Sequence, residues 1–176
     1  MTELVDIFDA DWNPTGEVLP RAEAERLKKW RKSVVVWIVN PRGELLFQLR
    51  MPNKEIYPSH WAASAAGCPR AGESEVAAMV REAREELGIE LAPEGLVEFD
   101  RYNMALDSHW RLQISYLYRA DLAPSDFSVD GNEVAGVRYI PWRELFAMSD
   151  AQMWAAKIVP QQELKKLYKH LEKGGL

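Results

Sequence analysis

The sequence predicts an α+β fold, in which a β-sheet is covered by helices. Short apolar runs rich in valine, isoleucine and aromatic residues recur along the 176 residues, as expected of strands. One longer segment carries apolar residues three and four positions apart, which is typical of an amphipathic helix. Strands and helices do not alternate strictly, and this argues against a parallel sheet made of strand–helix–strand units.

The N-terminal segment predicts a hairpin followed by a polar connector. Val5 and Ile7 alternate with polar residues, and Asn13–Gly16 consists of turn-forming residues. The hairpin is therefore expected over residues 5–20. The polar residues 21–32 that follow are expected to be helical or irregular.

The next segment predicts two strands, a loop and the long helix. Residues 33–50 predict two strands around Asn40–Gly43, whose proline in the second position and glycine in the fourth favour a type I turn. Residues 51–61 contain two prolines and no apolar period, so they predict a loop. A helix is expected over residues 74–87, with an apolar stripe that consists of Val76, Val80, Ala83 and Leu87.

The C-terminal part of the chain predicts further strands and two helices. Strands are expected near residues 96–104, 111–120 and 134–141, where apolar and aromatic residues gather between polar turns. Helices are expected over residues 142–149 and 159–173, which have helix-forming residues and no glycine.

Charge and composition narrow the class of protein. The net charge is −5 at pH 7 and the pI is about 5.3, so the overall field does not favour a nucleic-acid polymer as a partner. Cys68 is the only cysteine, which excludes an internal disulfide and fits a reducing compartment. The first residues lack the basic and apolar regions of a signal peptide, and no apolar run approaches the ~20 residues of a membrane span. We expect a cytoplasmic protein that does not bind a membrane.

We predict a single domain over residues 1–176, in which residues 1–30 form an N-terminal hairpin and connector extension. A chain of this length suits one hydrophobic core. The hairpin at residues 5–20 would present a strand edge that a second subunit can cover. We therefore expect a homodimer.

Three glutamates lie close together in the predicted helix. Glu82 and Glu86 are four residues apart on one helix face, with Glu85 beside them, so their like charges destabilise the helix. Either this is an ordinary solvated face or a cation binds there. Arg81 lies four residues before Glu85 and can hold its carboxylate while the other two bind a hard cation. Ligands that are all oxygen favour magnesium or manganese, which also bind substrate phosphates.

A glycine-containing loop, residues 67–73, leads into this helix. Such a loop can offer a backbone carbonyl to a metal, and its amides lie near the helix N-terminus, where an anion is favoured. Glu73 is at the expected start of the helix, where the helix dipole favours a carboxylate. The fixed order of the whole stretch from Gly67 to Ile89 argues against a merely solvated surface.

That order resembles the Nudix box, G-x5-E-x7-R-E-U-x-E-E-x-G-U, in which U is a bulky aliphatic residue. The matching positions, all at the stated spacing, are Gly67, Glu73, Arg81, Glu82, Glu85, Glu86, Gly88 and Ile89. Ala83 is smaller than the aliphatic residue usual at its position. A weaker resemblance extends over most of the chain beyond about residue 30.

The resemblance implies a mixed β-sheet sandwiched between helices, with the box forming a loop–helix–loop. It also implies that water, with a divalent metal, hydrolyses a diphosphate joined to another moiety, X. The implied metal ligands are Glu82, Glu86, Glu85 and a backbone carbonyl at Ala66 or Gly67. Glu85 is alternatively the base, and Glu73 and Arg81 would orient the ligands.

Residues outside the box complete the predicted site. Relatives in the family often use a further acid, and Glu133, just before a predicted strand, is similar to it as a base or extra ligand. Arg50 and Lys54 can supply the positive charge that a phosphate-binding cleft needs, although solvated surface positions are the alternative. Trp61 and Tyr102 can stack on a base or cover an apolar tail, with core or rim packing as the alternative.

The segment before the box resembles isopentenyl diphosphate isomerase, a relative with the same fold. That enzyme has W-T-N-S-x-C-G-H-P where this chain has Trp61–Pro69. The isomerase's protonating cysteine falls on Ala66, its metal-binding histidine falls on Cys68, and another ligand histidine falls near Arg31. Because alanine cannot transfer a proton, we expect a hydrolase, with the isomerase as the alternative. A catalytically silent binding module is a third reading, and the intact box acids argue against it.

The predicted function is hydrolysis of a diphosphate linkage in a nucleoside di- or triphosphate or a related X-diphosphate, with Mg²⁺ or Mn²⁺ as cofactor. Nucleotide sugars, dinucleotides and prenyl diphosphates fit the same chemistry. The identity of X depends on loops for which no transferable code exists.

Overall fold

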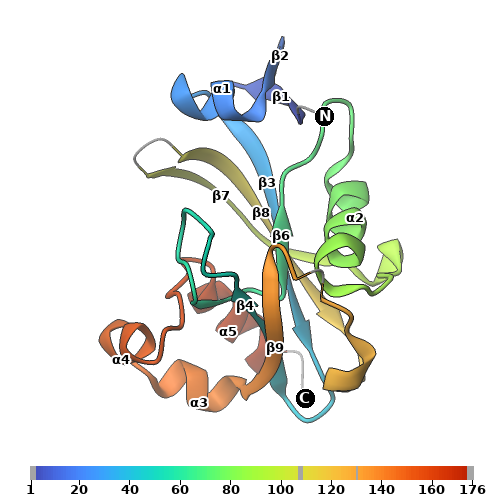
Figure 1. The fold of residues 1–176 in the computed structure, drawn as a ribbon, viewed down its shortest axis with the longest axis vertical. Coiled ribbons are helices and arrows are strands. Elements are labelled where there is room, and N and C mark those ends of the chain that lie inside the picture. The colour runs from blue at the N-terminus through green and yellow to red at the C-terminus, as the bar shows by residue number, and fades with distance from the viewer. Residues whose placement is uncertain (1–2, 107–108, 130, 174–176) are drawn as a thin grey trace.

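In the computed structural model, which describes residues 3–106, 109–129 and 131–173, a seven-stranded mixed sheet forms the centre of the molecule (Figure 1). Its strands are β3 (Arg31–Val39), β4 (Glu44–Arg50), β5 (Trp61–Ala62), β6 (Ala65–Gly67), β7 (Val97–Leu106), β8 (His109–Arg119) and β9 (Val134–Pro141). The main path runs β5-β4-β3-β8-β7, with β6 paired to β3 and β9 paired to β4. β3 and β8 are parallel and the other pairs are antiparallel, so the predicted mixed sheet is confirmed.

The central strand β3 is buried on both faces. Val34, Val36 and Ile38 point into one hydrophobic cluster, and the alternate residues Val35 and Trp37 point into another. A strand covered on both sides needs apolar residues at nearly every position, which explains the unbroken run in its sequence. Helices must therefore cover both faces of the sheet.

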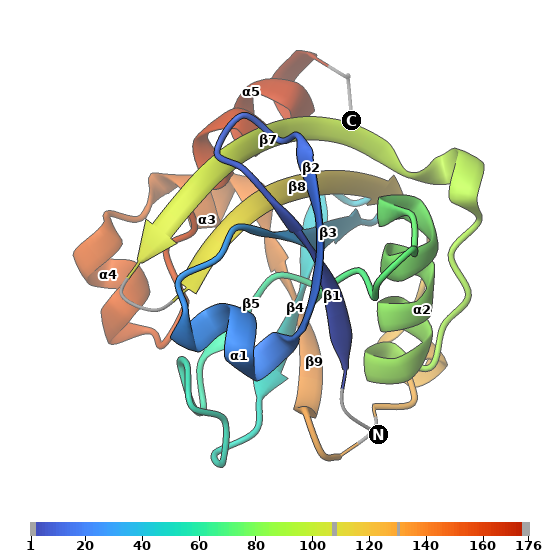
Figure 2. The same ribbon diagram turned by 90° about the horizontal axis from the view of Figure 1, so that it is seen from above.

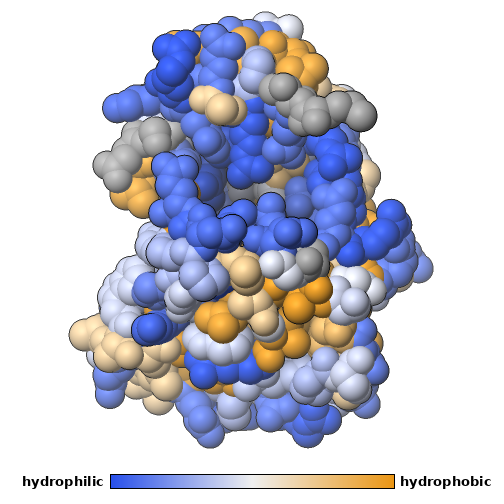
Figure 3. Space-filling view, in the orientation of Figure 1, coloured by the Kyte–Doolittle hydropathy of each residue, from blue (hydrophilic) through white to orange (hydrophobic). Residues whose placement is uncertain are grey.

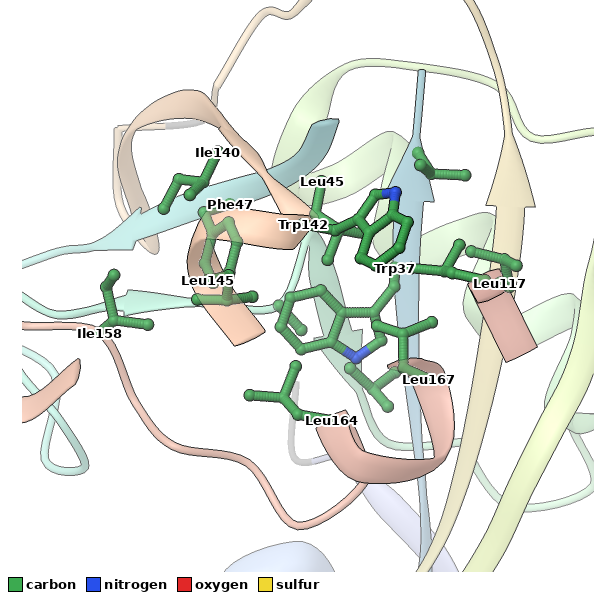
Figure 4. Packing of buried hydrophobic residues seen from close by; sticks show 14 of the residues in the cluster. Trp37, Leu45, Phe47, Leu117, Ile140, Trp142, Leu145, Ile158, Leu164 and Leu167 are labelled. Carbon is green, nitrogen blue, oxygen red and sulfur yellow. The ribbon is translucent and has the colours of Figure 1, made fainter. Parts of the chain in front are cut away.

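Helix α2 (Glu75–Leu87) covers one face, and α3 (Trp142–Ala147), α4 (Asp150–Ala155) and α5 (Leu164–Lys173) gather on the other side (Figures 1 and 2). On the second side, Trp37 of β3 packs among Trp142, Leu145 and Leu167 (Figure 4). The predicted sandwich of a sheet between helices is thus confirmed. Among the described residues, no helix is long and apolar enough to cross a membrane.

Helix α4 was not predicted from the sequence, because six residues are too few to show a helical period. A local signal does exist: Ser149 accepts a hydrogen bond from the N–H of Gln152, and the Gln152 side chain accepts one from the N–H of Ser149. This reciprocal pair is a capping box. Two short 3₁₀ helices, η1 (Pro93–Gly95) and η2 (Pro124–Asp126), complete the described connections.

The N-terminal strands β1 (Leu4–Phe8) and β2 (Pro14–Pro20) form the expected hairpin as a separate two-stranded sheet, followed by α1 (Arg21–Arg26). The predicted turn position is wrong: Pro14 already belongs to β2, and the chain reverses over residues 9–13. The Asp9 carboxylate decides this, because it accepts hydrogen bonds from the N–H groups of Asp11 and Asn13.

The sheet divides at its centre, and this division positions the functional residues. β3 pairs with β4 only at Val39 and Leu45, next to the connecting turn. Farther along, β3 pairs with β6, whereas β4 pairs with β5 and β9. The start of β3 at Arg31 and the end of β4 at Arg50 therefore belong to separate arms of the sheet, on the side away from the turn.

Candidate functional site

Helix α2 has well-defined ends, and these set the position of the acids on it. Ser74 is the N-cap, and its hydroxyl accepts a hydrogen bond from the N–H of Ala77 at 3.2 Å. At the other end Gly88 adopts a left-handed conformation with φ +69°, where a Cβ would lie 2.7 Å from the Ser128 carbonyl oxygen. Glycine at this position ends the helix and allows the close approach of residue 128.

The guanidinium of Arg81 binds the acids of this region together. It contacts both Glu73 oxygens at 2.9 Å, a forked arrangement, and also Glu82 at 2.8 Å and Glu85 at 3.0 Å. A further hydrogen bond goes to the Cys68 carbonyl oxygen at 3.0 Å. Arg81 thus joins the helix to the loop before it, and it holds Glu82 as well as the predicted Glu85.

Glu73 lies one residue before the N-cap, outside the first turn of α2. Its carboxylate faces Arg81 and accepts the N–H of Arg70 at 2.8 Å. Burial alone would raise the pKa of Glu73, but the hydrogen bonds from Arg81 and Arg70 leave it lowered. The contact with Arg81, rather than the helix dipole, therefore accounts for a glutamate here.

Glu86 is a buried carboxylate whose side chain is 4% exposed. It accepts hydrogen bonds from the Gln48 amide at 3.2 Å and from the Ala66 N–H at 3.0 Å. No ion pair joins Glu86 to any of the described residues. Burial raises the pKa of Glu86 to about 8, and the charges of Glu82 and Glu133 add to this effect.

Glu82 lies against the backbone of the loop. Its carboxylate accepts the Cys68 N–H at 3.3 Å, and burial raises its pKa in spite of Arg81. A Cβ at position 67 would lie 1.9 Å from the Glu82 carboxyl carbon, so only glycine lets the chain pass here. The Gly67 Cα and the Glu82 carboxylate are consequently close neighbours, whereas the Gly67 carbonyl oxygen accepts the Ser33 hydroxyl at 3.2 Å.

Glu85 differs from Glu82 and Glu86 because it is half-exposed. Arg70 and Arg81 engage its oxygens at 3.2 and 3.0 Å. Within the described part of the chain, no three acidic, histidine or cysteine side chains converge on one point as a metal cluster would. Glu82 and Glu85 instead share the Arg81 guanidinium, whereas Glu86 accepts hydrogen bonds from Gln48 and the Ala66 N–H.

A cavity of about 290 Å³ lies next to the acids, between α1 and the loop after β4. Figure 3 shows a hollow in this region with hydrophilic side chains around it. Its lining contains the predicted Arg50 and Lys54, together with residues that the sequence did not single out: Arg21, Glu25, Asn53, Glu55, Ile56, His109, Arg111 and Asn132. These come from four separate segments, so no local pattern could have found them.

The other predicted site residues lie in different surroundings. Glu133 pairs with Lys54 at 3.0 Å, and its charge also acts on Glu86 and on Arg50. Neither Trp61 nor Tyr102 is among the cavity's lining residues. The Trp61 ring lies 4.1 Å from the Arg138 guanidinium, and the Tyr102 hydroxyl donates to Glu163 at 2.8 Å. Their predicted roles at the substrate remain predictions.

A larger cavity, of about 830 Å³, lies between α3 and α5. Its walls include Trp142, Phe146 and Tyr168, and none of the box residues contributes to them. Cavity size alone therefore does not locate the chemistry in this molecule.

The fold and the helix with its acids can now be compared with known proteins. A sequence model of the NUDIX domain matches residues 29–162 of this chain. The chain belongs to the NUDIX domain family. The matched region contains the box loop, α2 and Glu133, whereas the N-terminal hairpin and α1 lie before it.

Relatives of this NUDIX chain include both kinds of enzyme that the sequence resembles. An uncharacterized Nudix hydrolase of Listeria monocytogenes is 31% identical over 145 residues, which cover 81% of this chain and 82% of the relative. An isopentenyl-diphosphate Delta-isomerase of Shigella dysenteriae is 27% identical over 156 residues, covering 88% and 85%. A crystal structure of a Deinococcus radiodurans protein has a TM-score of 0.72 and 22% identity, covering 96% of this chain and 98% of that one. The predicted resemblance to both groups is confirmed, and the fold is that of the family.

Arg81→Ala should destabilise the protein by roughly 2 kcal/mol or more, because it leaves Glu73, Glu82 and Glu85 without their shared cation. Thermal unfolding should show a melting temperature lower by about 5 °C or more. The matched control is Arg84→Ala, on the exposed face of the same helix, which should change the melting temperature little. Equal melting temperatures of the two variants would contradict the central place given to Arg81.

Glu86→Gln should stabilise the metal-free protein at alkaline pH. The pKa of Glu86 is raised from 4.5 to about 8 in the folded state, so wild-type stability falls as pH rises between these values. Glutamine removes this loss, so with chelator the variant should melt at least about 2 °C above wild type at pH 8.5. The two proteins should melt alike at pH 4.5, and the exposed Glu94→Gln should show no gain at either pH.

Proposed function

We propose that this chain is a metal-dependent hydrolase that cleaves a diphosphate linkage, with Mg²⁺ or Mn²⁺ as cofactor. The observation that carries the proposal is Glu86, a buried carboxylate beside Glu82 with no ion pair to any described residue. Burial without an ion pair keeps this carboxyl protonated below its raised pKa, and a bound cation would favour its charged form. The coarser conclusion, membership of the Nudix hydrolase family, agrees with this chemistry.

The residues present fit a hard divalent cation. Their donors are all oxygen: the carboxylates of Glu82 and Glu86, the Gly67 carbonyl, which now accepts the Ser33 hydroxyl, and Glu85 as a further ligand. The close approach of the Gly67 backbone to Glu82 favours joint binding by these two groups. When bound, the cation would neutralise charge on the phosphate oxygens and lower the pKa of a water molecule.

Arg81 and Glu73 act as positioning residues in this proposal. Arg81 fixes the orientation of Glu82 and of the Cys68 carbonyl, and Glu73 in turn fixes Arg81 through two hydrogen bonds. Such supporting contacts hold ligands in place and raise their affinity. The Gln48 amide and the Ala66 N–H donate hydrogen bonds to the Glu86 carboxylate, and these two contacts set its direction.

Glu133 is the proposed general base. Two arginines engage the carboxylate of Glu85, which makes that acid a weaker candidate than Glu133, which pairs with Lys54. Glu133 is close enough to Glu86 and Arg50 to act on both electrostatically. Water would attack phosphorus while Glu133 takes its proton, and the P–O bond of the anhydride would break, with the bridging oxygen leaving on the departing phosphate. Arg50 and Lys54 would bind the substrate phosphates.

The substrate is proposed to be a nucleoside di- or triphosphate or a related X-diphosphate. The test is release of phosphate or pyrophosphate across a panel of such compounds in H₂¹⁸O with Mg²⁺. We expect turnover that chelator abolishes and ¹⁸O in a phosphate product, since the box offers no serine or cysteine nucleophile with a paired base. Glu86→Gln and Glu82→Gln should each lower turnover by at least ~100-fold, and Glu94→Gln should not. Full activity after chelation would overturn the proposal.

Isomerase activity is the second candidate, because an isomerase is among the relatives. Two features argue against it. Ala66 stands where the isomerase has its protonating cysteine, and the nearby Cys68 is buried, with its thiol between Arg31 and the Lys32 carbonyl. Burial also raises the pKa of Cys68, which opposes its ionisation.

The isomerase candidate makes a separate prediction. Incubation with isopentenyl diphosphate and Mg²⁺ in deuterated water should give no rearranged, deuterated product. The reason is that Ala66 has no thiol to transfer a proton and Cys68 is buried. Mass spectrometry of the recovered prenyl diphosphates measures this. Deuterium in dimethylallyl diphosphate would instead favour the isomerase and contradict the assignment as a hydrolase.

A further inference from the structure

The cavity beside the carboxylates has the opposite charge from them. Four positively charged side chains line it, Arg21, Arg50, Lys54 and Arg111, against the two acids Glu25 and Glu55, and burial lowers the pKa of the fifth basic residue, His109. The chain as a whole carries a net charge of −5, so this gathering of cations is local. A concave site lined by one sign of charge concentrates ligands of the other sign.

Most of these cations already have partners. Arg21 pairs with Glu3 at 3.0 Å and with Glu25 at 3.5 Å, and Lys54 pairs with Glu133 at 3.0 Å. Arg50 donates from its Nε to the Ile56 carbonyl oxygen at 2.9 Å. Each of these interactions holds a wall of the cavity in place.

Arg111 is different. Its side chain forms no hydrogen bond or ion pair with any described residue, and its Nε is fully buried without a partner among them. A buried guanidinium nitrogen that lacks an acceptor costs free energy, so unpaired donors in native proteins point to a missing partner. Arg111 is therefore the position in the cavity where an acceptor is lacking.

The charged neighbours of Arg111 also favour the binding of an anion beside it. In the parallel pairing of β3 with β8, Arg111 lies beside Arg31, which is 2% exposed. Arg31 has its own partners, the Glu25 carboxylate and the Cys68 sulfur, the latter at 3.0 Å. Burial, together with the charges of Arg31 and Arg21, lowers the pKa of Arg111 to about 10. The Glu25 carboxylate pairs with Arg21 and Arg31, so it does not serve as an ion-pair partner for Arg111.

The size and position of the cavity indicate which anion it takes. A volume of about 290 Å³ is at the low end for organic ligands, and the lining is polar, so a compact anion fits better than a nucleobase. The cavity adjoins the proposed base, because Lys54 in its lining pairs with Glu133 at 3.0 Å, and the charges of Glu86 and Glu133 also act on Arg50. An anion in the cavity can therefore belong to the same substrate as a diphosphate at the carboxylates.

We propose that this cavity binds an additional phosphate group of the substrate, with Arg111 as its specificity-determining residue and Arg21 as a second contact. The inference rests on the proposed function and narrows it: compounds with three consecutive phosphates, such as nucleoside triphosphates, are favoured over the matching diphosphates. Arg21 belongs to α1, before the NUDIX match, so the N-terminal extension contributes to substrate choice.

The first test is metal-free binding, which does not depend on turnover. Calorimetry in chelator with tripolyphosphate, pyrophosphate and inorganic phosphate should show tightest binding of tripolyphosphate by the wild type. Arg111→Gln should weaken this binding at least about tenfold, and Arg111→Lys should restore part of it. Arg119→Gln, at the exposed far end of the same strand, is the matched control and should bind as the wild type does.

Folding is checked by thermal unfolding of each variant. Because Arg111→Gln removes a cation that faces other cations, its melting temperature should not fall below that of the wild type. If that variant unfolds early, Arg111→Lys against wild type decides the question through the tripolyphosphate affinity. Wild-type affinity in every folded Arg111 variant, or no binding of tripolyphosphate by the wild type, overturns the proposal.

The second test is kinetic, with a nucleoside triphosphate and the diphosphate of the same nucleoside. Arg111→Gln should raise KM for the triphosphate at least about tenfold and KM for the diphosphate less than about twofold, with kcat little changed. Equal effects on both compounds overturn the proposed subsite while hydrolysis stands. Arg111-dependent tripolyphosphate binding without any hydrolysis supports the subsite and overturns the proposed function instead.

Discussion

The contact of Arg81 with the loop before its helix is the interaction on which the rest of the site depends. One guanidinium binds Glu73, Glu82 and Glu85 and also the Cys68 carbonyl, so helix and loop are fixed by a single side chain. The planar, permanently charged fork of arginine can satisfy several acceptors at once, which a lysine ammonium cannot do with the same geometry. Without this cation, the carboxylates of Glu73, Glu82 and Glu85 would repel one another where the loop meets α2.

The site has two neighbouring parts of opposite charge, the carboxylates of α2 and the basic cavity. The carboxylate side contains Glu86, buried and without an ion pair to described residues, and the cavity side contains Arg111, also without a partner. Both arrangements are unfavourable for the folded chain alone, and a metal–phosphate complex would compensate both. Local rules of protein stability are typically broken at functional sites in this way. Arg31 and Cys68 lie at the positions that resemble the metal-binding histidines of the isomerase. In this chain these two side chains contact each other, so the positive charge there comes from the Arg31 guanidinium.

Much of this was predictable from the sequence. The apolar stripe predicted a helix over residues 74–87, and the observed span of α2, Glu75–Leu87, agrees with that prediction. Strands followed from β-branched runs between turns, since side-chain periodicity is a local property. The failures were also local: Asp9 moved the hairpin turn, and α4 was too short to show a period. The spacing of the box residues likewise predicted that Glu82, Glu85 and Glu86 share one side of a helix.

The sequence by itself determined the family, the helix that carries the acids, and the chemistry that those acids permit, because each of these depends on spacing within a short segment. Only the tertiary structure decided which residues surround them. Arg111 lies beside Arg31 because two strands eighty positions apart pair in parallel, and Arg21 reaches the same cavity from the extension. Burial and the balance of neighbouring charges arise from such distant pairings. They leave the side chains of Glu86 and Arg111 without an ion pair to any described residue.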